Sequence, residues 1–405
     1  MHMHPTSAED SILEGDAGLM ARQLMKRLQP QRWPIPLDRF PPGTVLVGGA
    51  VRDGLLNRLP KHPDLDMVVP ADALGQVRKL SQEFGGACVV LDRDRDMARL
   101  VLGSWTIDLA RQEGDDLRAD LLRRDYRINA IALTLSTEPT LLDPSGGIAD
   151  LRHQRITAVH EQNLLDDPLR LLRALRLVAE LSMTIDGATL KMIERHRNQL
   201  PKVAPERIQA ELLKLVHANN ADEAISLLHS LQLIAPWSSD QAQRRFDARA
   251  LTQKEQQLAL PLARLTQLLS DQGINDLRFS RKQIQRSLRL RTWWSRDQQQ
   301  CVDTLNERER LKLHQELEED LPAFTLAWPL ERQKEWLNRW RDQEDPLFHP
   351  CAPLNGRTLQ AELGLRPGPH LGELIHHLCL ERAFGRILSQ NDAIQCARAW
   401  MNKPL

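Results

Sequence analysis

The chain has few cysteines and no long apolar run, and each absence excludes a class of protein. Its five cysteines are scattered, odd in number and never spaced as Cys-x-x-Cys. This usage predicts reduced thiols, with no structural disulfide and no zinc site. No stretch approaches the ~20 consecutive apolar residues of a membrane span, and the acidic amino terminus lacks the apolar core of a signal peptide. We therefore expect a cytoplasmic protein without a membrane partner.

The sequence also lacks a net charge, because 54 Lys and Arg residues balance 54 Asp and Glu residues. Total charge thus says nothing about an acidic partner, and any surface for nucleic acid must be a local cluster. No fixed-period repeat and no low-complexity block interrupts the 405 residues. That length exceeds what one compact core usually takes, so we expect two or more packed units.

Strand-like and helix-like patterns divide the chain into two parts. Between Thr44 and about Val159, the runs TVLV, LDMVV, ACVVLD, ARLVL and WTIDLA predict strands, mixed with helical segments. After Asp166 the strand signals stop, and apolar residues recur at helical spacing. The sequence therefore predicts an α/β head followed by an all-α remainder. Proline-rich or polar segments predict breaks between helical units at residues 201–205, 238–245 and 341–353.

The strongest local signal is the run VLVGGAVRDGLL, residues 45–56. A predicted strand ends there at Gly48 and Gly49, where the missing side chains let backbone N–H groups approach a phosphate chain closely. Arg52 follows on the first turn of a predicted helix. Such a corner suits a triphosphate, although a Gly-Gly turn alone is usually just a turn.

Two aspartates follow in the next predicted strand, PDLDMVV. Asp64 and Asp66 are two residues apart, so strand alternation points both carboxylates to one face. The strand WTIDLA adds Asp108. Hard cations such as Mg²⁺ take oxygen ligands and complete their shell with substrate phosphates. An Asp-x-Asp pair alone is usually a solvated strand edge. Beside a phosphate-binding turn it indicates two-metal nucleotidyl transfer, with Asp64 and Asp66 as metal ligands and all three aspartates as catalytic residues.

Arginines further along the chain supply candidate contacts for a nucleotide. In DLLRRDYRINAIAL, Arg124 precedes a predicted helical apolar run, and its planar fork of donors matches phosphate oxygens. In DDPLRLLRALR, Asp167 and Arg170 present an acceptor and a fork that suffice to read the edge of a base. Arg173 and Arg176 follow Arg170 at steps of three. Ordinary surface charge on amphipathic helices is the alternative for both segments.

Basic residues cluster between 278 and 296, a stretch without an acidic residue. In a neutral chain this cluster predicts phosphate contacts with a nucleic acid and salt-dependent binding. The adjacent Trp293 and Trp294 fit base stacking or, equally well, helix packing. The predicted RNA-binding residues are Arg278, Arg281, Lys282, Arg286, Arg289 and Arg291.

Together these pieces resemble the class II tRNA nucleotidyltransferases, the family of CCA-adding enzymes and bacterial poly(A) polymerases. LVGGAVRD, DLD, DLLRRDYRINAIAL, LLDPSGGIADLRHQRI, DDPLRLLRALRL and PERIQAEL follow one another in the family's order, from about Thr44 to Leu213. A further match, LNGRTLQAELGLRPGPHLGELI with AFGRILSQNDAIQCARAW, is similar to the tail of the tRNA-specific members. It favours tRNA over poly(A) tails as the substrate.

The resemblance implies a template-independent RNA nucleotidyltransferase. Its head would carry a nucleotidyltransferase (polymerase β-like) mixed sheet, followed by an all-α neck, body and tail. It implies two Mg²⁺ ions, tRNA as partner, CTP and in some members ATP as nucleotide, and pyrophosphate as product. The implied segments are an N-terminal extension 1–40, a head 41–160, a neck 161–220 for base recognition, a body 221–340 and a tRNA-binding tail 341–405.

The family's site residues carry over to matching positions. Asp64 and Asp66 match its metal ligands, and Asp108 matches its third carboxylate. The resemblance implies nucleotide contacts from the corner, the arginine motif and the neck helix, at Gly48, Gly49, Arg52, Arg124, Asp167, Arg170, Arg173 and Arg176.

One departure from the family bears on which nucleotides are added. Only six residues, 114–119, separate Glu113 from Asp120, where members that add the terminal A carry a longer mobile loop. In the family that loop lets the base pocket switch from C to A, so its absence is the mark of CC-adding members. We therefore expect addition of two C residues.

The alternatives are full CCA addition or A addition, poly(A) polymerase activity on any RNA 3′ end, and an inactive RNA-binding protein. The presence of all three aspartates speaks against the last of these.

Overall fold

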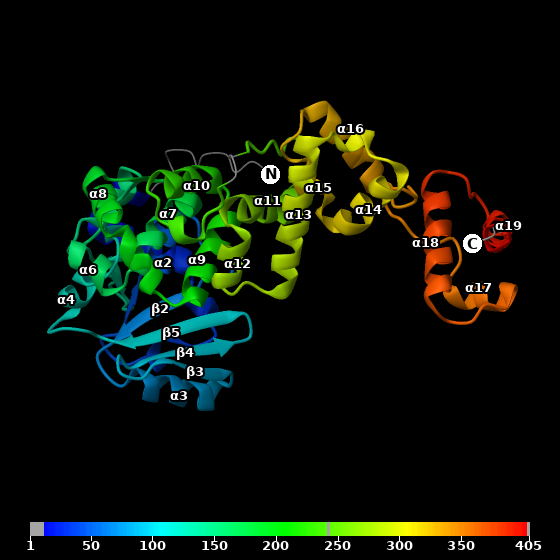
Figure 1. Cartoon of the computed structure of the whole chain (residues 1–405). Helices are drawn as coiled ribbons and strands as arrows, with labels where there is room; N and C mark the ends of the chain where they lie inside the picture. Colours follow the sequence, from blue (N-terminus) through cyan, green and yellow to red (C-terminus); the bar gives the residue numbers. More distant parts are fainter. Residues whose placement is uncertain (1–11, 241–243, 403–405) are drawn as a thin grey trace. The chain divides into compact units, whose positions relative to one another are not determined.

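The structure is a computed structural model that describes residues 12–240 and 244–402. The chain divides into two compact units. The first comprises the described residues up to Ala204 together with Asn219–Leu233, and the second comprises Pro205–Ala218 and the described residues from Ile234 onward. All named strands of the described residues belong to the first unit, and helices build the second (Figure 1). The predicted α/β head is thereby confirmed, and the described part after Asp166 is helical apart from one two-residue strand.

A seven-stranded mixed sheet forms the base of the first unit, in the order β3-β4-β5-β2-β1-β6-β7. β2 and β5 pair in parallel, whereas the other neighbouring strands pair antiparallel. All five runs predicted as strands lie in this sheet. Its strands are β1 (Val45–Val47), β2 (Leu65–Val69), β3 (Ala87–Asp92), β4 (Met97–Leu102), β5 (Trp105–Arg111), β6 (Ala132–Thr134) and β7 (Leu141–Leu142).

The part of the sheet formed by β3, β4 and β5 has one apolar and one polar face. Helix α3 (Ala73–Phe84) contacts all three strands (Figure 1). On β5, the fully buried Ile107 and Leu109 alternate with the half-buried Asp108. Because successive side chains of a strand point to opposite faces, Asp108 projects away from the apolar face.

Helices frame the sheet, and α1 packs against α2, the helix that begins at the glycine corner. Arg27 of α1 donates a hydrogen bond to the carbonyl of Gly54 at 3.0 Å. A Cβ on Gly54 would lie 2.3 Å from Cδ1 of Leu24, so a larger residue here would displace the Leu24 side chain. The helices are α1 (Ala17–Leu28), α2 (Gly49–Leu55), α4 (Leu117–Leu122), α5 (Gly147–Arg152), α6 (Glu161–Asp166), α7 (Leu169–Leu181), α8 (Gly187–His196) and α10 (Ala221–Ser230).

Two details of the first unit differ from the sequence prediction. The apolar run that ends DLLRRDYRINAIAL is not helical, because Ala132–Thr134 forms β6 between β1 and β7. Ala132 and Leu133 are buried, and a short apolar run reads alike in a buried strand and a buried helix. Strand pairing also continues after Asp166, since β8 (Arg155–Ile156) pairs in parallel with β9 (Thr184–Ile185).

The second unit is helical, and its main core packs leucines together with tryptophans and phenylalanines. Thr252 and Ser280 form capping boxes that start α11 and α13. No helix of the described residues is long and apolar enough to cross a membrane. The helices are α9 (Pro205–His217), α11 (Gln253–Leu268), α12 (Asp271–Asp276), α13 (Arg281–Gln299), α14 (Glu307–Leu317), α15 (Leu321–Thr325), α16 (Leu330–Arg341), α17 (Gly356–Leu363), α18 (Pro369–Ala383) and α19 (Gln390–Met401).

The last three helices enclose a small apolar core of their own. It is built from Leu354, Leu359, Leu371, Leu374, Leu378, Ile387, Ala393 and Ala397. The connection from α16 to α17, residues 342–355, contains no helix, as the sequence predicted for 341–353. The predicted break at 201–205 also separates two helical segments, ending at Lys202 and beginning at Pro205.

Candidate active site

The glycine corner lies directly against one of the predicted catalytic aspartates. Gly48 follows β1 with φ 71° and ψ −135°, a conformation open to glycine and costly for other residues. A Cβ at this position would lie 3.2 Å from Oδ2 of Asp66 and 3.7 Å from Nη1 of Arg124. The backbone at Gly48 therefore lies close to both a carboxylate and a guanidinium, and α2 begins at Gly49. Three separate motifs of the sequence meet at this corner.

Asp66 and Asp108 occupy directly paired positions on the parallel strands β2 and β5. Val47, the last residue of β1, pairs with Asp66 on its other side. Asp64 immediately precedes β2 and is exposed, whereas Asp66 and Asp108 are half-buried. The structure thus brings the carboxylates of two separate strands together at the end of the sheet where the glycine corner lies.

Electrostatics distinguish Asp66 from its neighbours. Its pKa is raised to about 6, first by burial and then by the charges of Asp108 and Asp64, while Arg124 and Arg173 lower it. An ionised Asp66 is therefore repelled by two other carboxylates in a partly desolvated place. A divalent cation would relieve this repulsion.

The donor set fits a divalent cation that also binds the substrate. Among the described residues, no three Asp, Glu, His or Cys side chains gather tightly enough to enclose a metal ion by themselves. Mg²⁺ is usually held by one or two carboxylates and completes its shell with water and substrate phosphates. Asp64 and Asp66 with an open side toward the glycine corner match that requirement.

Arg99, which binds Asp108, was not among the predicted site residues. Arg99 on β4 donates through Nε to Oδ1 and through Nη2 to Oδ2 of Asp108, both at 2.8 Å. These hydrogen bonds raise the pKa of Arg99, against the effect of burial, and the charges of Asp108, Asp64 and Asp66 add to the rise. A signal was present, because the short turn between β4 and β5 sets the register in which Arg99 faces Asp108.

The two predicted phosphate-binding arginines differ in their surroundings. Arg124 points Nη1 toward the glycine corner, and its Nη2 donates to Asp120 at 3.2 Å. Arg52 lies beside Gly49, but its guanidinium is buried and engaged. Its Nε and Nη2 bond Asp53 at 2.8 and 3.0 Å, and its Nη1 bonds Asn129 at 2.8 Å. Nη1 of Arg124 thus faces the glycine corner, whereas all three nitrogens of the Arg52 guanidinium are hydrogen-bonded within the protein.

A buried carboxylate joins the head to the predicted base-reading helix. Oδ2 of Asp125 accepts a hydrogen bond from Arg173 at 2.8 Å, and Oδ1 accepts from the backbone N–H of Tyr126 and from Asn129. Burial would raise the pKa of Asp125, but Arg173, Arg170 and these hydrogen bonds lower it to about 2. Because Asn129 also holds Arg52, one continuous network links α2 to α7.

The remaining predicted residues of α7 and its start are half-buried. Arg170 donates through Nη1 to the carbonyls of Arg123 and Asn163, both at 2.9 Å. Asp167 precedes α7, and its carbonyl accepts the N–H of Arg170. Arg176 pairs with Glu180 at 2.6 Å. Arg173 and Arg176 are therefore placed as supports of the helix.

The predicted RNA-binding residues divide into exposed and engaged side chains. Arg281 and Lys282 are exposed on the first turn of α13, and Arg278 just before it is exposed and paired with Glu206. Arg291 is buried, with hydrogen bonds to Leu269, Asp271 and Ser239.

Two further arginines of α13 are bonded to groups of the same unit. Arg286 is paired with Asp320, and Arg289 bonds the carbonyl of Glu316. Trp293 and Trp294 are 2% exposed and belong to the core, which confirms the packing interpretation of this pair. We therefore leave Arg291 and both tryptophans out of the proposed RNA-binding surface.

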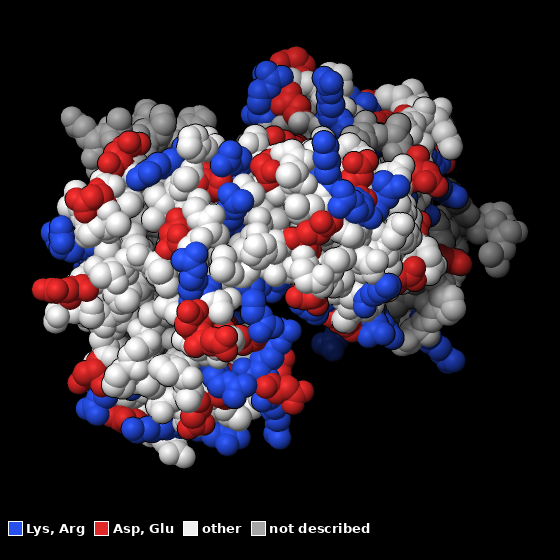
Figure 2. Space-filling view, turned by 90° about the vertical axis from the view of Figure 1, so that its left-hand side faces the viewer, with Lys and Arg blue, Asp and Glu red and all other residues white. Residues whose placement is uncertain are grey.

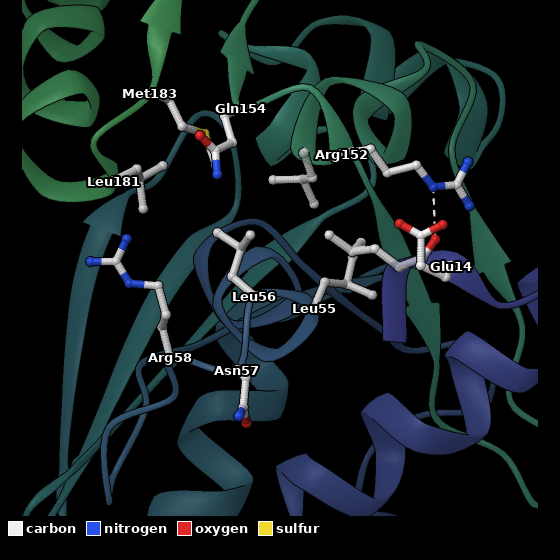
Figure 3. A pocket seen from close by; sticks show the side chains of 11 residues that line it. Glu14, Leu55, Leu56, Asn57, Arg58, Arg152, Gln154, Leu181 and Met183 are labelled. Atoms are coloured by element: carbon white, nitrogen blue, oxygen red, sulfur yellow. Dashed lines mark hydrogen bonds between the residues drawn. The ribbon is translucent and has the colours of Figure 1, made fainter. Parts of the chain in front are cut away.

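Charged side chains of both signs and one cavity are further features of the described residues. Figure 2 shows basic and acidic side chains interspersed over the face that it presents. A cavity of about 320 Å³ lies between Leu55 of α2, Leu151 of α5 and Leu181 of α7. Arg58 and Arg152 stand at different sides of it, and none of the residues that line it is a predicted site residue (Figure 3).

The part of the chain that carries this geometry is similar to known proteins. Residues 44–157 match the model of the poly(A) polymerase head domain. Residues 182–242 match a model described as a probable RNA- and SrmB-binding site of polymerase A. The first match contains the glycine corner and all three aspartates.

Full-length similarity extends beyond the head. A CC-adding tRNA nucleotidyltransferase of Synechocystis sp. is 30% identical, with 91% of this chain and 96% of that protein covered. An A-adding tRNA nucleotidyltransferase of Deinococcus radiodurans is 39% identical over 49% of this chain and 46% of that protein. The structure of a Thermotoga maritima CCA-adding enzyme in complex with tRNA superimposes with a TM-score of 0.68 at 20% identity, covering 89% of this chain and 91% of that one.

Proposed function

The chain belongs to the tRNA nucleotidyltransferase and poly(A) polymerase family of template-independent RNA nucleotidyltransferases, and we propose that it adds two cytidylate residues from CTP to the 3′ end of tRNA, with release of pyrophosphate. The observation that carries the chemistry is the direct pairing of Asp66 with Asp108 beside the Gly48 corner.

Each group at the corner has a defined task in this proposal. Asp64 and Asp66 hold two divalent cations, which we take to be Mg²⁺, together with phosphate oxygens of the nucleotide. Bound cations of this kind lower the pKa of an attacking 3′-hydroxyl and neutralise charge on the leaving pyrophosphate. Asp108 completes the carboxylate set. Arg124 directs Nη1 to the place of the phosphates, and the open backbone at Gly48 lets them approach.

Base selection belongs to α7 in this proposal. Asp167 and Arg170 offer an acceptor and donors within one turn, and Arg173 is fixed by the buried Asp125. An acceptor and a guanidinium fork at fixed spacing suffice to read the edge of a pyrimidine or a purine by hydrogen bonding rather than by a template. The restriction to CTP in this proposal rests on the connection between β5 and α4, and ATP would be a substrate only if the terminal A were also added.

The short connection between β5 and α4 supports the restriction to C. β5 ends at Arg111 and α4 begins at Leu117. The segment between them is tied down at both sides, because the N–H of Glu113 bonds Asp120 at 3.0 Å and Asp116 caps α4 at Ala119. A segment held in this way has little freedom to act as the lever that C-to-A switching needs.

A labelled-nucleotide assay tests this function. The purified protein is incubated with tRNA transcripts that end before the CCA, after one C and after CC, each with CTP or ATP alone. Incorporation of two C residues on the first transcript, one on the second and none on the third is expected. ATP incorporation on the transcript ending in CC would replace this proposal by full CCA addition.

A-adding activity is the second candidate, and the D. radiodurans relative supports it over 49% of the chain. It predicts ATP incorporation on the transcript ending in CC and no incorporation of CTP on any transcript. ATP-dependent extension of an unrelated RNA would instead indicate a poly(A) polymerase, and no incorporation by a folded protein would indicate an RNA-binding role.

A further inference from the structure

A row of paired residues crosses the polar face of the sheet and includes both central carboxylates. Val89 of β3 pairs with Arg99 of β4, Arg99 pairs with Asp108 of β5, and Asp108 pairs with Asp66 of β2. Directly paired residues of neighbouring strands project on the same face of a sheet. Arg99 therefore stands in line with the proposed metal ligand Asp66, with Asp108 between them.

Arg99 engages both oxygens of Asp108. The two hydrogen bonds of 2.8 Å form a fork, which is the strong and geometrically specific form of an Arg–carboxylate pair. The side chain of Asp108 is 18% exposed and that of Arg99 is 42% exposed. The fork fixes the rotamer of Asp108 and occupies lone pairs that a cation would otherwise use.

A guanidinium in this row opposes cation binding in two ways. It competes for the oxygens of Asp108, and its positive charge repels a divalent cation held by Asp64 and Asp66. Arg124 adds a second positive charge on the other side of Asp66. A nucleoside triphosphate would bring compensating negative charge, so the cation gains affinity once the phosphates are present.

We propose that Arg99 is a positioning residue that holds Asp108 in place and weakens binding of divalent cations to the nucleotide-free enzyme, so that metal and nucleotide bind together. This role rests on the proposed function, because it concerns the same carboxylates. Unlike that function, it concerns the enzyme before any nucleotide is bound.

The test measures Mn²⁺ binding to the full-length protein without nucleotide, by electron paramagnetic resonance of free Mn²⁺. Arg99→Gln is expected to lower the Kd for Mn²⁺ about 3- to 10-fold, because a competing cation is removed. Arg99→Lys keeps the charge without the fork, so its Kd is expected between those of Arg99→Gln and the wild type.

Arg39→Gln is the matched control, because Arg39 forms an ion pair with Glu83 in the same unit. It is expected to leave the Kd for Mn²⁺ unchanged. An unchanged or weaker affinity in a folded Arg99→Gln protein would overturn the proposal, as would a failure of wild type and variant alike to bind Mn²⁺ at millimolar concentration. Circular dichroism establishes that each variant is folded.

A double-mutant cycle with Asp108→Asn tests the route of the effect. If Arg99 acts through Asp108, Arg99→Gln changes the Kd less in the Asp108→Asn background than in the wild type. An equal change in both backgrounds would contradict the positioning role. If the wild-type protein incorporates no nucleotide but Arg99→Gln still lowers the Kd for Mn²⁺, the proposed function fails and the role of Arg99 stands. Failure of the proposed function and failure of the role of Arg99 are therefore distinguishable.

Discussion

The hydroxyl of Tyr126 donates a hydrogen bond of 2.6 Å to the main-chain carbonyl of Arg170, and the tyrosine is completely buried. The contact joins the arginine motif of the head to the first turn of α7. It lies one residue from Asp125, which holds Arg173 of the same helix. Two successive residues therefore set the position of the proposed base-reading helix.

Replacing this tyrosine tests that relationship. Tyr126→Phe is expected to lower the free energy of unfolding by about 1 kcal/mol, the net value of one hydrogen bond. It should also raise the KM for CTP, because α7 loses a fixed point. Urea unfolding and steady-state kinetics measure the two effects.

Thr44→Val serves as the control for that variant. The Thr44 hydroxyl donates to the carbonyl of Pro41 at 2.6 Å, a bond of the same kind at the start of β1. We expect a similar loss of stability with an unchanged KM. A KM that rises equally in both variants would show that Tyr126 acts only on stability.

Removal of the proposed metal ligand should separate chemistry from RNA binding. Asp66→Asn is expected to reduce nucleotide incorporation roughly 1,000-fold or more, because the cations that stabilise the transferring phosphoryl group lose a ligand. The Kd for tRNA, measured by filter binding, should stay within about twofold, since exposed basic residues supply that affinity. Incorporation that survives in Asp66→Asn would exclude Asp66 as a ligand.

The raised pKa of Asp66 predicts a dependence of stability on pH. In the folded, metal-free protein its pKa is about 6, above its ordinary value of 3.8. The folded state therefore binds more protons between these values, and the free energy of unfolding falls as pH rises from about 4 to about 6. We expect a loss of about 1–2 kcal/mol attributable to this group.

Urea unfolding in EDTA at pH 4, 5, 6 and 7 measures this loss. Asp66→Asn should lack the fall, so the variant should become more stable relative to the wild type as pH rises. Glu138→Gln, which removes an exposed carboxylate, provides the reference. Parallel curves for the wild type and Asp66→Asn would refute the expected titration.

The two kinds of basic residue on α13 should behave differently. Replacing the exposed Arg281 and Lys282 by Ala is expected to weaken tRNA binding about 3- to 10-fold and to reduce the slope of log K against log salt by about 1 to 2. Arg291→Gln should instead lower the free energy of unfolding by about 2–3 kcal/mol, because buried partners lose a charged donor. Unchanged tRNA affinity in the first variant would exclude this turn of α13 from the RNA surface.

Local patterns sufficed to predict the glycine corner and its two neighbouring aspartates. Two-residue alternation in PDLDMVV is a property of any strand, and positive φ at Gly48 follows from a residue without a side chain. The predicted division into neck, body and tail stays a prediction. The two compact units do not follow its boundaries, because α9 of the predicted neck lies in the second unit and α10 of the predicted body lies in the first.

Features that depend on strand register or on contacts between segments were not predicted. Arg99 became visible only through the register of β4 and β5, and Asn129 only through its contacts with Arg52 and Asp125. The hydrogen bonds of Arg52 were not predicted for the same reason. Its position on the first turn of α2 is correct, but a neighbouring carboxylate and an amide 77 positions along the chain decide where the guanidinium points.

The self-contained core of α17 to α19 has an evolutionary consequence. Because this core draws its buried members from positions 354 to 397 alone, a substitution there alters the terminal module without disturbing the carboxylates of the sheet. Selection is therefore able to alter the packing of α17 to α19 while the arrangement of the sheet carboxylates is inherited unchanged.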